Sequence, residues 1–528
     1  MTLMASDAVI VVLAAGKGTR LKSGLAKVLH RAGGRPLVEH VVRACQALGS
    51  TGFQPVRSGS SENRTGYKPV PPVVVVGHQA EDVRAAVEPL GPTTVVQEPQ
   101  LGTGHAVMVA REAMGRAKYA VVLPGDAPLI RTETIASLVR AHTSGNAAVT
   151  ILSALLDDPS GYGRIVRTPD GTVAAIVEEK ALRADQRAIR EINSSIYCFT
   201  LEKLWPVMSE LKPANVHKEL YLTDAIALLD QRGERVLAEI APDSHEVLGC
   251  NTRADLAEVD RIFRARKRAA LMDAGVTIYL PETVLIDADV EVGADTLIEP
   301  AVQLLGATRI GAGCTIKTGS VISDSVLEDG VTVKQHCVVA NSRLGAGVAV
   351  GPFAHLRDGA ELRAGARVGN YVEVKKSVLE EGVKAMHLTY LGDATVGKSS
   401  NIGAGTITCN YDGVRKNPTR IGERVFVGSG TELVAPVQVG DGAYIAAGST
   451  ITADVAADAL AIARARQETK PGWAAARRAK LAGERRAPSA HEKAQPATTN
   501  PAAKRACANG RPRKRKLETR KPKFARRK

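Results

Sequence analysis

A glycine-rich, cationic segment follows the first apolar run of the chain. Residues 8–12 (AVIVV) are apolar and mostly β-branched, and residues 13–27 (LAAGKGTRLKSGLAK) then supply Gly16 and Gly18 together with several Lys and Arg side chains. Bare backbone N–H groups in such a turn approach an anion while the cations neutralise it. The segment lacks the GK[ST] ending of a P-loop, and Leu21 occupies the place of the third glycine of a dinucleotide fingerprint. It therefore predicts phosphate binding without naming the nucleotide.

A second group of polar residues lies between residues 353 and 417. The segments there are FAHLRDGAEL, GNYVEVKK, KAMHLTYLGD and NIGAGTITCNYDGVRKN. Histidine ordinarily titrates near neutral pH, and a positioned histidine base contributes roughly 10²- to 10⁴-fold to a proton transfer. A lone histidine is more often structural, but His387 has these polar neighbours and is a candidate base.

Residues 8–250 alternate short apolar strands with helical stretches. The clearest strands are AVIVVL from Ala8, VVVVG from Val73, TVVQ from Thr94, YAVVLPGD from Tyr119 and AAVTILSA from Ala147. This alternation predicts an α/β domain with a mostly parallel sheet, in which ligands bind beyond the carboxyl ends of the strands. We expect the turn at Gly16 and the PGDAPL turn at Pro124 to lie at that edge.

From residue 292 onward an aliphatic residue recurs every six residues, with occasional one-residue slips. The series is Val292, Ile298, Leu304, Ile310, Ile316, Ile322, Leu327, Val333, Val339, Leu344, Val350, Leu356, Leu362, Val368, Val374, Val396, Ile402, Ile421, Val427, Leu433, Val439, Ile445 and Ile451. Neither a helix nor an alternating strand produces this spacing. It predicts a parallel β-helix of about nine three-sided coils, each face sending one aliphatic side chain inward. The loop within 401–417 interrupts the repeat.

Two connecting segments have their own signatures. Residues 252–273 place apolar side chains at helical spacing before Gly275, which predicts a connecting helix packed on the first domain. Residues 50–72 are polar and rich in Gly, Ser and Pro, which predicts a long surface loop. We therefore expect an N-terminal domain over 1–251, a linker helix over 252–275, a β-helix domain over 276–483 and a tail over 484–528.

The net charge of +15 is concentrated at the C-terminal end. Thirteen Lys or Arg residues and one acid, Glu518, lie within 504–528, so this stretch carries +12 and the rest of the chain +3. A tail of this composition is typical of a disordered arm. It is interpreted either as an electrostatic tether without a specific site or as a contact for acidic partners, and the body carries no nucleic-acid signature.

Cysteine usage and hydropathy point to a soluble cytoplasmic protein. Seven cysteines with no CxxC pair favour reduced thiols over a disulfide framework or a zinc site. The apolar run at 8–15 lacks the basic flank of a signal peptide, and no stretch approaches the roughly 20 apolar residues of a membrane span.

Seven motifs in one order resemble the sugar-nucleotide pyrophosphorylases. They are LAAGKGTR with AKVLH, QEPQLGTGHA, PGDAPL, GYGRI, IVEEK, EINSSIY and GCNTR. With the hexapeptide repeats behind them, the chain is similar to the bacterial bifunctional enzymes that acetylate glucosamine-1-phosphate and then uridylylate it. The resemblance implies a Rossmann-like nucleotidyltransferase domain followed by a left-handed β-helix. Ala26 and Thr252 depart from the usual Pro and second Asn of that family.

The resemblance also implies roles in uridylyl transfer. Nucleotide binding falls to Leu13, Ala14, Ala15, Gly16, Gln97, Gly102 and Thr103, its phosphates to Arg20 and Lys27, and the N-acetylglucosamine to Gly163, Glu178 and Asn193. Asp126 and Asn251 would ligate Mg²⁺, a hard cation that prefers oxygen ligands. No protein nucleophile is needed, because the sugar phosphate attacks the α-phosphorus of UTP and expels pyrophosphate.

For acetyl transfer, the motif HLTYLGD assigns His387 as the base. Glucosamine-1-phosphate is assigned to Arg357, Lys375, Tyr390 and Asn401, with Glu373 and Asn410 in support, and acetyl-CoA to Ala404, Asn410, Tyr411, Lys416, Ser429, Ala447 and Arg464. Backbone N–H groups near Ala404 or Tyr411 are candidates for steadying the thioester oxyanion. The family is trimeric, so the resemblance also implies a homotrimer that shares this site between subunits.

Two other interpretations remain open from the sequence. The chain is either a uridylyltransferase alone, whose β-helix assembles subunits, or an inactive interaction protein on the same scaffold. The intact HLTYLGD and NIGAGTITCNYDG motifs argue against the first, and the presence of Lys27, Asp126, Asn251 and His387 argues against the second.

Overall fold

The structure is a computed structural model that describes residues 7–48, 71–169, 171–213 and 219–486. The chain divides into two units, Met1–Arg464 and Ala465–Lys528. Most of the predicted surface loop at 50–72 and most of the predicted basic tail lie outside the described residues.

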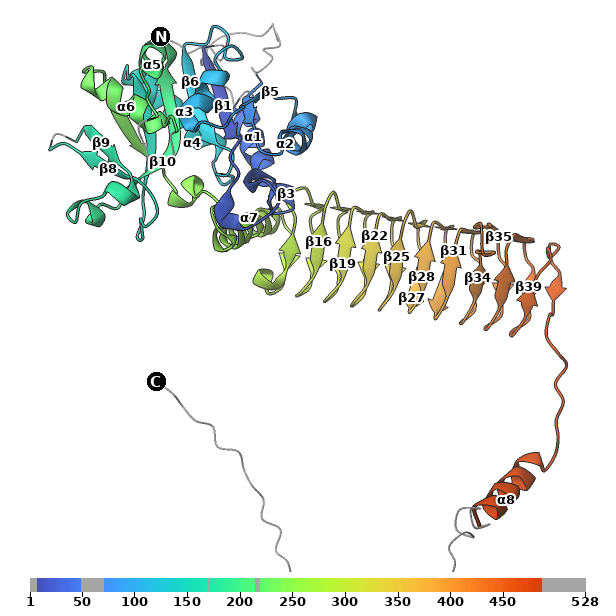
Figure 1. Ribbon diagram of the computed structural model, residues 1–528. Coiled ribbons are helices and arrows are strands. Elements are labelled where there is room, and N and C mark those ends of the chain that lie inside the picture. Colours follow the sequence, from blue (N-terminus) through green and yellow to red (C-terminus); the bar gives the residue numbers. More distant parts are fainter. Residues whose placement is uncertain (1–6, 49–70, 170, 214–218, 487–528) are drawn as a thin grey trace, which may run out of the picture. The chain divides into compact units, whose positions relative to one another are not determined.

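An open, mostly parallel sheet forms the N-terminal domain (Figure 1). Its strands run in the order β11-β7-β10-β6-β1-β4-β5, and β8 and β9 extend it beside β10. Their bounds are β1 Ala8–Ala14, β4 Val73–Val76, β5 Thr93–Val96, β6 Tyr119–Pro124, β7 Val149–Leu155, β8 Arg164–Arg167, β9 Val173–Val177, β10 Glu191–Thr200 and β11 Val236–Ile240. The five strands predicted from the sequence are all present, and β10 is the antiparallel member between β6 and β7.

Helices cover both faces of this sheet and form a core on each. One core joins α3 (Thr103–Val109), α5 (Leu201–Met208) and α6 (Leu222–Gln231) to the sheet, and the other joins α1 (Leu37–Ala47), α2 (Ala80–Val87) and α4 (Thr132–Ser144). Valines of β1 alternate between the two cores. A strand buried on both faces reads as a continuous apolar run, which is why the strand signals were strong.

The connecting helix is α7, Arg253–Asp273, as predicted. Val259 and Ile262 pack in a small cluster with Leu37 and Leu129 of the α/β domain. Leu271, near its other end, belongs to the core of the β-helix. One helix therefore packs against the α/β domain with one end and against the core of the β-helix with the other.

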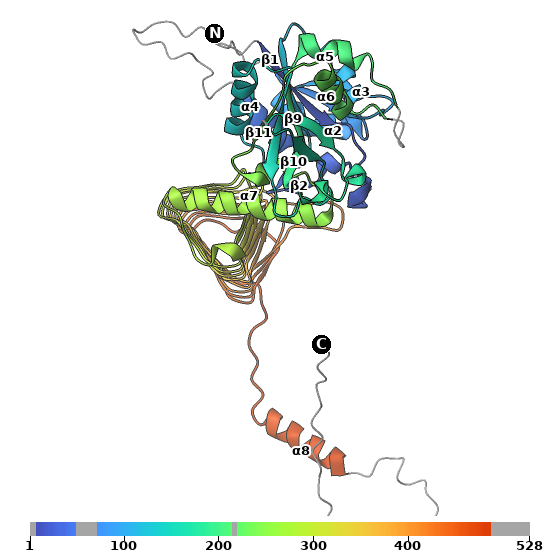
Figure 2. The same ribbon diagram turned by 90° about the vertical axis from the view of Figure 1, so that its left-hand side faces the viewer.

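The second half of Met1–Arg464 is the predicted three-sided prism, seen end-on in Figure 2. Three parallel sheets of 11, 10 and 9 short strands run from β12 (Thr277–Ile278) to β41 (Leu460–Ala461). Successive coils align in register, because Ile298 pairs with Ile316 and Ile316 pairs with Val333. The second of these coils is shorter than the first by a single residue. Such short coils explain the one-residue slips in the repeat.

The predicted aliphatic series fills the prism. Every member from Ile298 to Ile451 is buried in one continuous core, and Val292 packs against it. Leu379, Ala385 and Leu391 continue the series across the gap that the sequence pattern left after Val374. Burial of apolar surface contributes about 25 cal/mol per Å², so aliphatic side chains can stabilise such a prism without aromatic residues.

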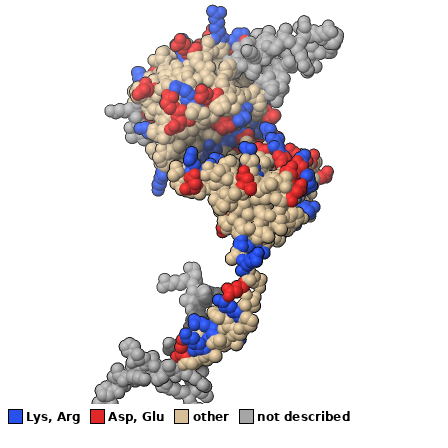
Figure 3. All heavy atoms as spheres, turned by 90° about the vertical axis from the view of Figure 1, so that its right-hand side faces the viewer, with Lys and Arg blue, Asp and Glu red and all other residues tan. Residues whose placement is uncertain are grey.

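The unit Ala465–Lys528 contains α8, Trp473–Arg486, an exposed helix on which Lys and Arg side chains gather (Figure 3). Among the described residues no helix has the length and apolar character that crossing a membrane requires. The six cysteines in the described part of the chain are all free.

Candidate functional sites

The glycine turn follows β1, and β1 pairs in parallel with β4 and β6. Gly16 is exposed, and a side chain built there would meet nothing within 4 Å, so its backbone is open to a ligand. Gly18 has a φ of +65°, and a Cβ at this position would collide with the side chain of Lys27. The glycines therefore leave an open backbone edge and permit Lys27 to pack under the turn.

Four of the predicted residues converge beside this turn. Asn251 Oδ1 accepts hydrogen bonds from Lys27 Nζ at 2.8 Å and from the Arg20 guanidinium at 2.7 Å. Lys27 also forms an ion pair with Asp126, and the backbone N–H of Cys250 donates to the Asp126 carbonyl. Residues 231 positions apart in the sequence thus share one site.

The N-terminus of α7 holds Asn251 in place. Asp255 Oδ2 accepts a hydrogen bond from the Asn251 backbone N–H at 2.8 Å. The same carboxylate and the hydroxyl of Thr252 form a capping box. Thr252, which departs from the family pattern, is therefore the N-cap of the connecting helix. Asp255 was not singled out from the sequence, although its spacing from Thr252 is the signal of a capping box.

The arrangement of Asp126 and Asn251 fits a hard divalent cation. Both side chains offer oxygen, and both already contact one cationic atom, Lys27 Nζ. Among the described residues no group of three or more His, Cys, Asp or Glu is placed to hold a metal. A cation bound by this pair would therefore keep water or substrate oxygens as its other ligands, which is the habit of Mg²⁺.

Three further predicted nucleotide residues, Gln97, Gly102 and Thr103, lie between the end of β5 and the first residue of α3. Gln97 is 3% exposed, and its amide nitrogen donates to the carbonyl of Gly102 at 2.9 Å. A Cβ at Gly102 would lie 2.7 Å from the Leu220 carbonyl, and Thr103 Oγ1 accepts from the backbone N–H of Leu222 at 3.0 Å. This close packing fixes the loop at the same edge of the sheet as Gly16.

The three predicted sugar residues are neighbours: Gly163 precedes β8, Glu178 follows β9 and Asn193 lies in β10. The Asn193 N–H donates to the Gly163 carbonyl at 2.9 Å, and a Cβ at Gly163 would lie 3.6 Å from a Glu178 oxygen. Burial and then the nearby Asp224 raise the pKa of Glu178. Asp224 at the start of α6 is a further carboxylate in this region that the sequence motifs did not indicate.

Four of the residues predicted to bind glucosamine-1-phosphate lie on consecutive strands of one prism face. Arg357 of β25 (His355–Arg357) pairs in register with Lys375 of β28 (Glu373–Lys375), and Glu373 with Tyr390 of β31 (Tyr390–Gly392). Arg357 Nη2 forms an ion pair with Glu373 at 2.7 Å. A shallow depression of about 300 Å³ lies beside them, lined in part by Glu373 and Tyr390.

Lys416 joins this cationic group. It is carried by a small hairpin in which Tyr411 bridges to Lys416 and Asp412 accepts from the N–H groups of Val414 and Arg415. The Lys416 side chain is the main cause that lowers the pKa of Lys375. Two ammonium groups side by side, with Arg357 nearby, suit a doubly charged phosphate, whereas the sequence assigned Lys416 to the phosphates of acetyl-CoA.

Asn410 anchors the base of the hairpin. Its amide nitrogen donates to Asp393 Oδ2 at 2.6 Å and contacts the Tyr390 hydroxyl at 3.4 Å. Asp393 has a left-handed φ of +50°. The sequence shows that Asp393 ends the HLTYLGD motif. Its hydrogen bond to Asn410 could not be predicted, because that contact depends on how the coils align.

His387 and four of the predicted acetyl-CoA residues, Ala404, Ser429, Ala447 and Arg464, form one column along a corner of the prism. The N–H of Gly405 donates to the His387 carbonyl, that of Gly430 to Ala404 and that of Gly448 to Ser429. Ala447 continues the column on the next coil, and a Cβ at Gly448 would touch the Arg464 side chain at 3.5 Å. Small side chains after His387 leave this corner open along its length.

Asn401 lies on a different face from Arg357 and Lys375. It belongs to β33 (Asn401–Ile402), in the sheet that also contains β30 (Lys384–His387), whereas the two cations lie on the sheet of β25 and β28. The structure gives no contact between Asn401 and the cationic group among the described residues. One chain alone therefore does not bring the whole predicted set together.

The backbone before Lys27 has a partner that the sequence did not indicate. The N–H of Ala26 donates to the side-chain oxygen of Gln79, a residue with a left-handed φ of +51° at the start of α2. Proline, the usual residue of the family at position 26, has no N–H to donate. Gln79 thus holds a turn that a proline would stiffen by itself.

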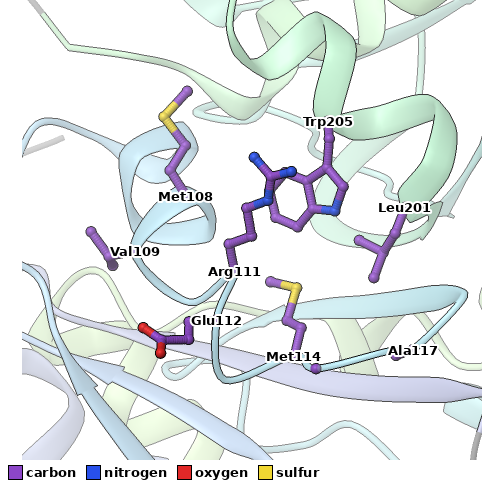
Figure 4. A pocket seen from close by; sticks show the side chains of 9 residues that line it. Met108, Val109, Arg111, Glu112, Met114, Ala117, Leu201 and Trp205 are labelled. Carbon is purple, nitrogen blue, oxygen red and sulfur yellow. The ribbon is translucent and has the colours of Figure 1, made fainter.

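A cavity of about 580 Å³ lies away from these residues (Figure 4). It is formed at the C-terminal end of α3 and by α5, where the guanidinium of Arg111 stacks 4.8 Å from the ring centroid of Trp205. None of the residues predicted from the sequence lines it.

Three family models match successive parts of the chain. Residues 10–192 match the MobA-like NTP transferase domain, residues 280–362 the GMPPB C-terminal domain and residues 418–453 the bacterial transferase hexapeptide repeats. These matches agree with the open α/β sheet and with the prism.

Relatives match over nearly the whole chain. The bifunctional protein GlmU of Koribacter versatilis is 49% identical over 476 residues, 89% of this chain and 97% of the relative. Those of Anaeromyxobacter sp. (strain Fw109-5) and Pelobacter propionicus are 47% and 46% identical, covering 89% and 88% of this chain and 93% and 97% of the relatives. The prediction of a bifunctional transferase, nucleotidyltransferase and acetyltransferase, is confirmed. The chain belongs to the GlmU family of bifunctional proteins.

Proposed function

We propose that the chain makes UDP-N-acetylglucosamine in two steps. Acetyl-CoA first acetylates the amine of glucosamine-1-phosphate, and UTP then uridylylates N-acetylglucosamine-1-phosphate with release of pyrophosphate. The observation that carries this proposal is that cationic side chains gather at two separate places, one at the edge of the sheet around Lys27 and one on the prism around Lys375.

Uridylyl transfer is proposed for residues 1–251. The turn at Leu13, Ala14, Ala15 and Gly16, with Gln97, Gly102 and Thr103, holds the nucleotide, and the triad of Gly163, Glu178 and Asn193 holds the sugar. Arg20 and Lys27 neutralise the phosphates and align the attacking oxygen with the α-phosphorus. Members of the family generally use a divalent metal. We assign Mg²⁺ to Asp126 and Asn251, where it would neutralise phosphate charge.

Acetyl transfer is proposed for residues 276–483, beyond the linker at 252–275. Arg357 and Lys375, joined by Lys416, bind the phosphate of glucosamine-1-phosphate, and Glu373, Tyr390, Asn401 and Asn410 bind its sugar. His387 takes the proton as the amine attacks the thioester carbonyl and CoA leaves as its thiol. The corner column of Ala404, Ser429 and Ala447, with Tyr411 and Arg464, accommodates acetyl-CoA.

A homotrimer is proposed as the active assembly. Phe353, Tyr371 and Leu388 occupy the same corner on consecutive coils and are 46%, 56% and 62% exposed. The rings of His336, Phe353 and Tyr371 stack at centroid distances of 5.3 and 5.4 Å. An apolar edge next to His387 is a typical protein contact surface. Burial of this edge against another copy would supply the groups, such as Asn401, that one chain places on another face.

The surroundings of the enzyme are also proposals. A cytoplasmic location is supported by the free cysteines in the described ranges, since reduced thiols are typical of that compartment. The basic tail over 484–528 is proposed to contact acidic partners by charge alone. The substrates are small molecules, and no specific nucleic acid is involved.

A pair of variants tests the two sites. Asp126→Ala is expected to abolish UDP-N-acetylglucosamine synthesis from N-acetylglucosamine-1-phosphate and leave CoA release unchanged, and His387→Ala is expected to do the reverse. Products are identified by mass after incubation with each sugar phosphate, acetyl-CoA, UTP and Mg²⁺. Loss of both activities in either folded variant would contradict two separate sites. Absence of acetyl transfer by the unaltered protein would leave the alternative, a uridylyltransferase with a structural β-helix.

A further inference from the structure

The ring of His387 has a specific partner on the preceding coil. Its Nδ1 lies 2.9 Å from Oδ1 of Asn370. Asn370 ends β27 (Arg367–Asn370) and His387 ends β30 (Lys384–His387), and the two residues are directly paired in the parallel register of these strands. The contact therefore arises from the coil repeat itself and not from a mobile side chain meeting by chance.

The backbone fixes the same geometry. The carbonyl of Asn370 accepts a hydrogen bond at 3.0 Å from the N–H of Leu388, the residue after the histidine. A Cβ at Gly369 would overlap the carbonyl oxygen of Met386, so only glycine permits the two coils to lie this close. Asn370 thus holds the His387 corner through its main chain and its side chain at once.

The chemistry of the pair follows from the acceptor. An amide oxygen has lone pairs and no proton, so the bond requires a proton on Nδ1 of the neutral imidazole. The other ring atom, Nε2, then carries the free lone pair. Nδ1 is the ring nitrogen with a hydrogen-bond partner in the described part of the chain. A base presented in one tautomer and one orientation avoids the fraction of molecules in which the wrong nitrogen faces the amine.

We propose that Asn370 is a positioning residue that fixes His387 in the tautomer with a bare Nε2, which takes the proton of the attacking amine. This inference rests on the proposed acetyl transfer. The amine nitrogen of glucosamine-1-phosphate bonds to the thioester carbon, the C–S bond breaks, and the proton accepted by Nε2 passes to the departing sulfur of CoA. Asn370 itself acts through His387 and takes no part in these bond changes.

Three substitutions separate this role from a structural one. Asn370→Leu removes the acceptor and is expected to lower kcat for acetyl transfer about 10- to 100-fold, the usual effect of losing the partner of a functional histidine, with both KM values within about twofold. Asn370→Asp retains an acceptor oxygen and is expected to restore most of kcat. Gln335→Leu removes an amide from the same column two coils earlier, where Gln335 and Phe353 share a backbone bond, and is expected to change nothing. Uridylyl transfer serves as the internal control for folding in every variant.

A spectroscopic measurement examines the tautomer directly. The full-length protein is labelled with ¹⁵N-histidine, and the His387 signals are identified in solid-state NMR spectra by their loss in His387→Gln. We expect the neutral ring to carry its proton on Nδ1 and none on Nε2, and a mixture of the two tautomers in Asn370→Leu. A protonated Nε2 in the unaltered protein, or an unchanged kcat in Asn370→Leu, would overturn the inference. Retention of acetyl transfer by His387→Ala would instead overturn the proposed function.

Discussion

Ala26, the residue before Lys27, donates a hydrogen bond from its backbone N–H to the side-chain oxygen of Gln79. Ala26 is fully buried, so loss of the acceptor would leave an unsatisfied donor, at a cost of about 1–3 kcal/mol. We expect Gln79→Leu to loosen the turn that presents Lys27 and to lower kcat/KM for UTP about tenfold. Steady-state uridylyl transfer measures this effect, with acetyl transfer unchanged.

A proline provides the sharper control for the same contact. Ala26 has a φ of −55°, which a proline ring accepts, and proline needs no acceptor. Ala26→Pro should therefore restore most of the lost kcat/KM in the Gln79→Leu background. If Gln79→Leu leaves kcat/KM for UTP unchanged, or if the proline deepens the defect, Gln79 does not position this turn.

The column of small residues after His387 gives a second prediction. Ala447 lies two coils beyond Ala404 at the same corner, where a larger side chain would fill the open edge. Ala447→Leu is expected to raise the KM for acetyl-CoA more than tenfold with little change in the KM for glucosamine-1-phosphate. Ala447→Ser, which stays small, should behave as the unaltered protein. An equal KM for acetyl-CoA in both variants would place the coenzyme elsewhere.

The exposed corner residues give a third prediction. Phe353→Lys combined with Tyr371→Lys replaces two stacked, exposed rings by charges that cannot be buried in a contact without a partner. We expect a monomer by light scattering, loss of acetyl transfer and retention of uridylyl transfer. Tyr279→Lys alters a similarly exposed ring on the first coil and should leave the assembly intact. A monomeric double variant with full acetyl transfer would argue against a shared site.

Sequence patterns predicted the elements well because burial determines them. The run AVIVV is apolar throughout because β1 is covered on both faces, and the six-residue series records one inward side chain per prism face. The inward residues between Val374 and Val396 were missed in the sequence. Ala385 is small, and the coils before and after it are among the short ones. The local pattern therefore predicts the strands, whereas the exact number of strands follows only from the register of the coils.

The sites were less accessible from the sequence, because their partners are distant along the chain. The motifs named Asp126 and Asn251, but the convergence of both on Lys27 depends on the packing of α7. Asn370 lies one short coil before His387, a relationship that becomes visible only once the coil length is known. The family motif assigned Lys416 to the coenzyme, and its closeness to Lys375 depends on the direction of the hairpin.

Histidine burial gives a prediction for acid stability. Burial, followed by the charge of Lys203, lowers the pKa of His142 to about 4, and its ring nitrogens bond to the hydroxyls of Thr150 and Thr200. A folded-state pKa below the ordinary value of about 6.5 means that the unfolded chain binds the proton first. Stability is therefore retained above pH 6.5 and decreases as the pH falls toward 4, by about 3 kcal/mol for this group.

The measurement follows unfolding of the α/β domain alone. Urea midpoints are read from Trp205 fluorescence in a Trp473→Phe background, since the chain has two tryptophans. His142→Gln is expected to show a shallower decrease between pH 6.5 and 4. Parallel pH profiles for the unaltered protein and His142→Gln would exclude this source of acid sensitivity.

The coil that carries the 410–418 hairpin is longer than its neighbours, yet Ile402 still pairs with Val427 in the same register as the coils around it. Each coil rests only on the one before it, so extra residues that leave and rejoin at a corner do not disturb the stack. Any coil of such a scaffold can therefore acquire a substrate-binding hairpin during evolution without a change in the coils before or after it.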